Sequence, residues 1–139
     1  MRMDKLTTKF QEALSDAQTL ALGADHAYIE PAHLLSAMLR QDDGPAPLLE
    51  RAGINTHALA QVANSALERL PQVSGQDQVQ VGRDLVSLLQ AAEKEGIKRG
   101  DQFIASELYL LALADSKIEF AQALKKAGLS RKSLEAAIS

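Results

Sequence analysis

The sequence predicts an all-α protein of eight helices, arranged as two pseudo-twofold-related four-helix repeats. The first observation is compositional: 46% of the 139 residues are hydrophobic, but only 4% are aromatic. A core of leucine, alanine, isoleucine and valine favours closely packed helices over a β-sandwich. The second observation is internal similarity, because residues 28–39 return as residues 103–114 at an offset of 75 positions without a gap. Self-similarity at a fixed offset indicates a repeated structural unit.

The first repeat is expected to contain four helices. Its opening helix carries one apolar stripe at helical spacing, with Thr7 as a plausible N-cap and Gly23 as a plausible stop. Pro31 suits the first turn of the second helix, where its missing N–H costs nothing. The pattern predicts helices at residues 7–22, at 31–41, over a short segment ending at 52, and from 56 to about 70.

The clearest local signal is a three-residue helix stop and restart that occurs twice. Gly53-Ile54-Asn55 supplies a glycine that can close one helix, an apolar residue that can cover its last turn, and a cap for the next helix. Gly128-Leu129-Ser130 holds the same three roles 75 positions later. A stop and a start repeated in register support two copies of one unit.

The second repeat is expected to follow a polar linker. We place repeat one at residues 1–70, the linker at 71–81 and repeat two at 82–139, with helices near 83–98, 106–115, 119–127 and 131–138. The caps are poorer here, because Gly82 aligns with Thr7 and Ala105 with Glu30, so that Ser106 is an alternative cap. No segment predicts a convincing β-strand.

Residue types that would carry catalysis are missing. The chain has no cysteine, no Gly-x-x-x-x-Gly-Lys-Ser/Thr loop and no serine in a nucleophile-elbow context. His26, His33 and His57 lie in three segments without the spacing of metal ligands. We expect His33 to be partly buried in its helix, and His26 and His57 to face solvent. The sequence therefore predicts a non-enzymatic protein with no catalytic residue, nucleotide site, metal or cofactor of its own.

Charge and hydropathy exclude two further classes of partner. The net charge of −3 leaves no basic field to hold a nucleic-acid backbone. The longest apolar run, residues 108–114, is far shorter than the roughly 20 residues of a membrane span. The N-terminus has no apolar run typical of a signal peptide. We expect a cytoplasmic protein that binds neither nucleic acid nor membrane.

One asymmetry between the repeats bears on function. His33 and Ser36 interrupt the apolar surface of the second helix on one face, whereas the equivalent positions hold Leu108 and Leu111. A helix that is apolar all round is either central or leaves apolar surface exposed. Both leucines can thus belong to the core, or they can line a surface groove for apolar polypeptide beside Glu107. We infer from the asymmetry that at least one of them is partly exposed.

Several motifs resemble those of a known family. A helix start of the type Ile-Ser/Thr-x-Glu-His-Leu-Leu occurs at residues 29–35 and again at 104–110, and an Ala-Gly-Ile/Val-like stop at 52–54 and 127–129. These motifs resemble the Clp N-terminal domain, the amino-terminal module of the Clp/heat-shock AAA+ unfoldases. The opening residues 1–11, and also residues 70–73 and 99–104, are similar to the ClpB branch, the protein disaggregases. The resemblance covers the whole chain.

The resemblance implies a chaperone function in the heat-shock and stress response. The full-length protein would be a hexameric, ATP-driven disaggregase that works with the DnaK chaperone system, with ATP and Mg bound in AAA+ modules outside this chain. This domain, monomeric on its own, would engage unfolded or aggregated polypeptide before threading. An alternative with the same fold is the adaptor-docking N-terminal domain of a Clp protease ATPase.

The polypeptide-contacting residues of the branch fall on Thr7, Asp101 and Glu107. Each also has a structural explanation: Thr7 as a helix cap, Asp101 as a turn residue after a glycine, and Glu107 as an anion in the first turn of a helix. Together with Leu108 and Leu111, these three residues make up the predicted polypeptide-binding site.

Overall fold

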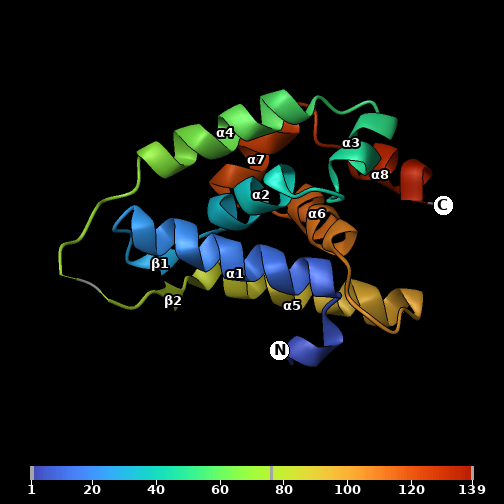
Figure 1. The fold of residues 1–139 in the computed structure, drawn as a ribbon. Helices are drawn as coiled ribbons and strands as arrows, with labels where there is room; N and C mark the ends of the chain where they lie inside the picture. Colours follow the sequence, from blue (N-terminus) through green and yellow to red (C-terminus); the bar gives the residue numbers. More distant parts are fainter. Residues whose placement is uncertain (1, 76, 139) are drawn as a thin grey trace.

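The computed structural model describes residues 2–75 and 77–138, and within them the chain forms the eight predicted α-helices (Figure 1). A short 3-10 helix and two very short strands accompany them. In chain order the elements are η1 Met3–Lys5, α1 Thr8–Gly23, β1 Tyr28–Ile29, α2 Pro31–Arg40, α3 Ala46–Arg51, α4 Thr56–Glu68, β2 Gln80–Val81, α5 Arg83–Arg99, α6 Ser106–Asp115, α7 Glu119–Lys126 and α8 Arg131–Ile138.

The offset of 75 positions predicted from the sequence also relates the helices of the two halves. The helix pairs α1/α5, α2/α6 and α4/α8 each begin at positions 75 apart. Contacts between the two halves are reciprocal, as a twofold axis requires. The Thr7 N–H donates to the Ile104 carbonyl at 3.1 Å, and the equivalent Gly82 N–H donates to the equivalent Ile29 carbonyl at 3.0 Å. In the same way, α3 packs against α8 while α7 packs against α4.

Both predicted helix stops are present with the expected geometry. Gly53 and Gly128 adopt left-handed backbone angles, with φ of 77° and 116°. The following N–H groups close the helices, from Ile54 to Leu49 at 2.9 Å and from Leu129 to Leu124 at 3.0 Å. The next helices are capped as predicted, by the side chain of Asn55 in α4 and that of Ser130 in α8.

Replacement of Gly53 by valine is expected to lower the free energy of unfolding by about 1–3 kcal/mol, because a β-branched residue is strained at positive φ. Apart from the adjoining residues, no atom lies within 4 Å of a Cβ placed at this position, so the cost comes from the backbone conformation rather than from a clash. Gly23→Val is the matched control, since Gly23 also has open space but no positive φ. Urea denaturation of both variants tests this; equal stabilities would mean that the left-handed stop contributes nothing.

Helix ends elsewhere differ in part from the sequence prediction. The Thr7 hydroxyl caps α1 as predicted, accepting from the Phe10 N–H at 3.2 Å. Gly23 ends α1, but Asp25, with φ of 59°, makes the left-handed turn. The Ser106 alternative is wrong: Ala105 is the N-cap position of α6, and it makes no side-chain cap hydrogen bond.

The linker contains more structure than the sequence indicates. β1 and β2 form a parallel pair in which Tyr28 faces Gln80 and Ile29 faces Val81, so the expectation of no strand is wrong for these residues. The Val73 N–H also donates to the Asp25 carbonyl at 2.7 Å. Two-residue strands have no detectable periodicity, because they are specified by pairing across the molecule rather than by local pattern.

The core is centred on α2 and α6, which lie in the middle of the molecule (Figure 1). Tyr109 is fully buried, packs edge-to-face against Phe10 with ring centroids 6.3 Å apart, and donates its hydroxyl to the Pro31 carbonyl at 3.1 Å. That hydrogen bond connects the central helices of the two repeats. It also satisfies a hydroxyl that would be costly to bury unpaired.

The inference that Leu108 or Leu111 is exposed is wrong. Their side chains are 1% and 0% exposed, and the equivalent His33 and Ser36 are buried as well. The face in question packs inside the molecule in both repeats, and the repeats differ only in how polar that buried face is. α6 is apolar all round because it is central, which removes both leucines from any surface site.

Among the helices that the structure describes, none is both long and apolar enough to cross a bilayer.

Candidate functional site

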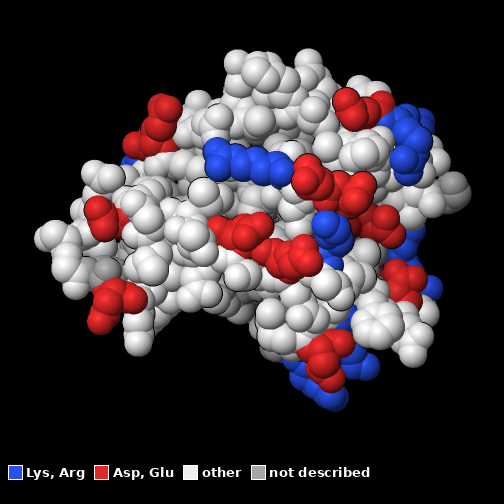
Figure 2. Space-filling view, in the orientation of Figure 1, with Lys and Arg blue, Asp and Glu red and all other residues white. Residues whose placement is uncertain are grey.

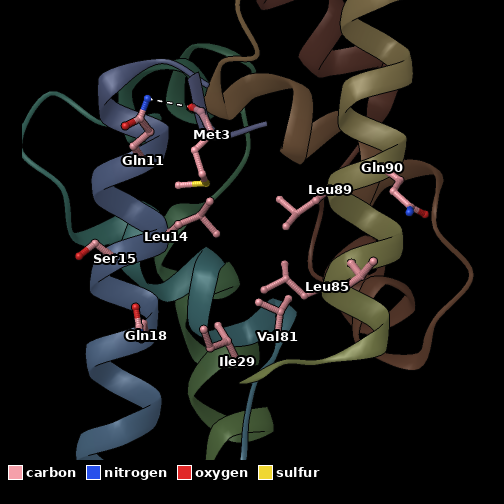
Figure 3. Close-up of a pocket in the computed structure, with 11 residues that line it drawn as sticks. Met3, Gln11, Leu14, Ser15, Gln18, Ile29, Val81, Leu85, Leu89 and Gln90 are labelled. Atoms are coloured by element: carbon pink, nitrogen blue, oxygen red, sulfur yellow. Dashed lines mark hydrogen bonds between the residues drawn. The ribbon is translucent and has the colours of Figure 1, made fainter. Parts of the chain in front are cut away.

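A groove of about 410 Å³ lies between α1 and α5 on the outer surface (Figure 3). We call it the apolar groove. Leu14 of α1 and Leu89 of α5 face each other across its middle (Figure 3). None of the side chains that line it is charged; they are Met3, Gln11, Leu14, Ser15, Gln18, Ile29, Val81, Leu85, Val86, Leu89 and Gln90.

Much of the apolar surface in this groove is accessible to solvent. Met3 is 52% exposed at one end, and Val81 and Val86 are 46% and 40% exposed at the other. The floor is rigid, because Leu85 and Ile29 are buried in the core behind it. Contiguous apolar surface in contact with water is unfavourable and is typical of interaction sites.

Local hydrogen bonding positions the Met3 end of the groove. The Gln11 side-chain amide donates to the carbonyls of Met3 and Leu6, both at 3.0 Å, and so holds η1 against the start of α1. At the other end, the pairing of β1 with β2 places Val81 beside Ile29. The two ends are therefore built by the two equivalent junctions of the repeats.

A second groove, of about 370 Å³, brings together two of the predicted site residues. We call it the polar groove; Thr7 and Glu107 both line it. They meet because the Thr7 N–H donates to the Ile104 carbonyl, which sets the start of α1 beside the start of α6. The remaining lining residues are Lys9, Asp43, Gly44, Pro45, Pro47, Leu48, Arg51, Ala105 and Ser106.

Asp101 lines neither groove. It is exposed and follows Gly100, which has a φ of 74°, and its N–H donates to the Gly96 carbonyl at 2.9 Å to close α5. This is the turn role considered from the sequence. Of the five predicted site residues, the structure thus brings Thr7 and Glu107 together, leaves Asp101 apart, and places Leu108 and Leu111 in the core.

Charge is unevenly distributed over the surface. In Figure 2 charged side chains gather across the centre and right of the face and at its bottom, whereas the top centre, over α4, shows none. The sequence explains this, because residues 55–67 contain no Asp, Glu, Lys or Arg. The apolar groove is likewise uncharged, so neither area would select a partner by charge.

Two histidines form a buried pair that the sequence did not predict. His26 was expected to face solvent, but it is buried, and its Nδ1 lies 2.8 Å from His33 Nε2. The Glu30 N–H donates to His33 Nδ1 at 2.8 Å, so His33 carries its proton on Nε2 and donates it to His26. Burial, and secondly His26, lower the pKa of His33 to about 4. The third histidine, His57, is exposed as predicted.

Among the described residues, no group of three or more His, Asp or Glu side chains is placed to hold a metal ion. The largest charged cluster has an evident structural role. Arg131 of α8 contacts Glu95 of α5 at 2.9 Å and Asp115 of α6 at 2.5 Å, and Arg99 contacts Glu135 at 2.7 Å. These ion pairs connect three helices at the surface.

The fold and the repeat define the class of protein. Residues 5–127 match the model of the Clp repeat (R) N-terminal domain, and the chain belongs to that family. Over 140 aligned residues it is 44% identical to the Chaperone protein ClpB of Pseudomonas putida. The alignment covers 99% of this chain but only 16% of that relative.

Solved structures show the same fold. The N-terminal domain of the ClpV1 ATPase from the Sci1 T6SS of E. coli EAEC superposes with a TM-score of 0.79 at 26% identity, over 96% of this chain and 83% of that one. A ClpV N-domain in complex with a VipB peptide superposes with a TM-score of 0.77 at 24% identity, over 97% of this chain and 85% of that one. The predicted family and fold class are confirmed.

Proposed function

We propose that this chain is the substrate-binding N-terminal module of a ClpB-type disaggregase and that it engages unfolded polypeptide in the apolar groove. The observation that carries the proposal is the uncharged, open groove between α1 and α5, in which Met3, Val81 and Val86 are about half exposed in the free domain. Similarity to ClpB chaperones and the complex of a related ClpV N-domain with a peptide support it.

The chemistry of the groove fits transient capture of many sequences. Fully burying one large apolar side chain contributes about 1.5–3 kcal/mol, and association costs at least about 4 kcal/mol in lost freedom. A groove of about 410 Å³ holds only a few such side chains, so binding is expected to be weak and quickly reversible. Hydrophobic burial is also non-directional, which suits a module that must accept unrelated unfolded chains.

The polar groove would extend the contact surface. Glu107 and Asp43 could accept hydrogen bonds from lysine or arginine side chains of a bound segment, and the Thr7 hydroxyl could bind main-chain groups. Asp101 would contribute only to a partner large enough to reach beyond both grooves. The adaptor-docking alternative shares the fold, but no feature of this chain favours it over polypeptide capture.

The chain spans only 16% of the length of the Pseudomonas putida ClpB, so the properties of the full-length protein are also proposals. From the similarity to ClpB we propose a hexameric assembly, AAA+ modules with ATP and Mg, cooperation with the DnaK system and a cytoplasmic location. The module would raise the local concentration of unfolded chain near the ATPase modules, as tethered binding sites do.

An NMR titration with a permanently unfolded, reduced and alkylated protein tests the binding site. The amide signals of residues lining the apolar groove are expected to shift. Leu89→Gln should weaken binding about tenfold or more, because it places a polar group in the middle of the groove. Val62→Gln is a control, since Val62 is a partly buried side chain on the α4 surface, away from the groove. Equal binding by the two variants would place the site elsewhere.

The isolated domain is expected to be monomeric, since hexamer contacts in the family belong to the AAA+ modules. A groove with only a few half-exposed apolar side chains is also smaller than the roughly 800 Å² per partner of a stable interface. Multi-angle light scattering at micromolar concentration measures this directly. A stable dimer would show that the apolar groove is covered by a second copy rather than free for polypeptide.

A further inference from the structure

The apolar groove lies across the pseudo-twofold axis of the molecule. Leu14 and Leu89, which face each other in its middle, are 75 positions apart and so occupy equivalent places in the two repeats. Two further pairs of lining residues have the same offset, Gln11 with Val86 and Ser15 with Gln90. The supporting helices α1 and α5 run in opposite directions along the groove (Figures 1 and 3). Rotation by half a turn therefore places one wall on the other.

The two ends of the groove are also equivalent in construction. At one end the main chain of Leu6 pairs with Ile104, and at the other the equivalent Val81 pairs with Ile29. Both ends expose apolar surface, from Met3 in the first case and from Val81 and Val86 in the second. A bound segment would thus meet apolar side chains at each end and a leucine from each wall in the middle, whichever way it ran.

We propose that the apolar groove binds an uncharged apolar segment in either N-to-C direction, with comparable affinity. This rests on the proposed function, and it specifies the ligand as a run of apolar side chains rather than a directed motif. Main-chain hydrogen bonds would impose a direction, but side-chain burial does not. The walls deviate from symmetry at Gln11 against Val86. At the ends, Met3 lines only one side, and Val81, Ile29 and Leu85 line the other, where their equivalents Leu6, Ile104 and Phe10 do not reach the groove. Because the side chains at both ends are apolar, we expect a preference of less than about tenfold between the two orientations.

A spin-label experiment tests the orientation. The probe is an uncharged peptide of leucine, alanine, serine and asparagine, about the length of the groove and blocked at both termini. It carries a nitroxide at its N-terminus in one preparation and at its C-terminus in the other. The readout is paramagnetic broadening of two equivalent amides at opposite ends, Thr7 and Gly82. Because the protein has no cysteine, the peptide carries the only label.

Each labelled peptide is expected to broaden both amides, with rates that agree within about tenfold. If the N-terminal label broadens one amide and the C-terminal label the other, the segment binds in one direction and the inference is overturned while the proposed function stands. If neither label broadens either amide, the groove does not bind the peptide, and both proposals fail. A labelled serine–asparagine peptide without leucine controls for collisions and should broaden neither.

Equivalent variants give an independent check. Leu14→Gln and Leu89→Gln each remove one leucine from the centre of the groove, and symmetry requires them to weaken peptide binding by the same factor within about threefold. Their fold should be retained, because both side chains are partly exposed. A tenfold or larger difference between the two would show that the walls are not equivalent to the ligand and would overturn the inference.

Discussion

Leu108→Ala is expected to lower the free energy of unfolding by about 3–5 kcal/mol, the range for removing a fully buried leucine from a close-packed core. The side chain is 1% exposed, and its Cδ1 would lie 3.2 Å from a Cβ placed on Gly96 of α5. The surrounding helices are fixed by other contacts, so the cavity would not collapse. Urea denaturation monitored by circular dichroism measures the loss.

Ile97→Ala is the matched control for this variant. Ile97 is the neighbour of Gly96 on α5, but it is 74% exposed, so its loss should cost less than about 0.5 kcal/mol. A double-mutant cycle adds specificity: Gly96→Ala should destabilise the wild type by overpacking and should be tolerated in the Leu108→Ala background, where the facing side chain is shorter. A loss below about 1 kcal/mol for Leu108→Ala would contradict its position in the core.

The sequence predicted the helices well because their signals are local. Caps at Thr7, Asn55 and Ser130 and left-handed glycines at 53 and 128 act within a few residues, and all five have the expected geometry. The repeat then determined the arrangement, since reciprocal contacts follow from two similar units packed together. The sequence pattern could not predict the pairing of distant segments, such as β1 with β2.

The site prediction failed at Leu108 and Leu111 for a related reason. Exposure of a leucine was inferred because His33 and Ser36 hold the equivalent positions, but polar residues there do not mark a solvent face: His33 is buried, and His26, seven residues earlier, accepts its hydrogen bond. Periodicity cannot detect a polar partner supplied across a turn. The sequence signal for the apolar groove lies on α5. Val86 and Leu89 are apolar but lie outside the buried stripe of Leu85, Leu88 and Ala92, and they face the groove.

The buried histidine pair is expected to make the domain sensitive to acid. Burial, and secondly His26, lower the pKa of His33 to about 4 in the folded state, against about 6.5 in an unfolded chain. The unfolded state therefore binds more protons between these values, and stability falls as the pH falls from about 6.5 to 4. The shift corresponds to about 3 kcal/mol, fully present above pH 6.5.

The hydrogen bonds of His33 also predict that acid lowers the stability of the fold. His33 Nδ1 accepts the Glu30 N–H and Nε2 donates to His26, so protonation would set a second N–H against the main-chain donor at the start of α2. Burial, and secondly the charge of Asp84, raise the pKa of Glu30. This shift changes the stability with pH in the opposite sense to that of His33. The folded state takes up the Glu30 proton at a pH above the ordinary pKa of Glu30, so the effect offsets part of the loss of stability as the pH falls toward that value.

His33→Leu isolates this contribution, because leucine is the residue that α6 carries at the equivalent position. The variant should be less stable at pH 7, by about 1–3 kcal/mol, since the Glu30 N–H and His26 lose a partner. Its stability should nevertheless change less between pH 6.5 and 4.5, with about one proton fewer taken up on unfolding. The exposed His57→Gln should keep the wild-type slope. Urea denaturation across this pH range measures the free energy of unfolding of both variants. If it depends on pH in His33→Leu as steeply as in wild type, His33 is not the group responsible for the loss of stability in acid.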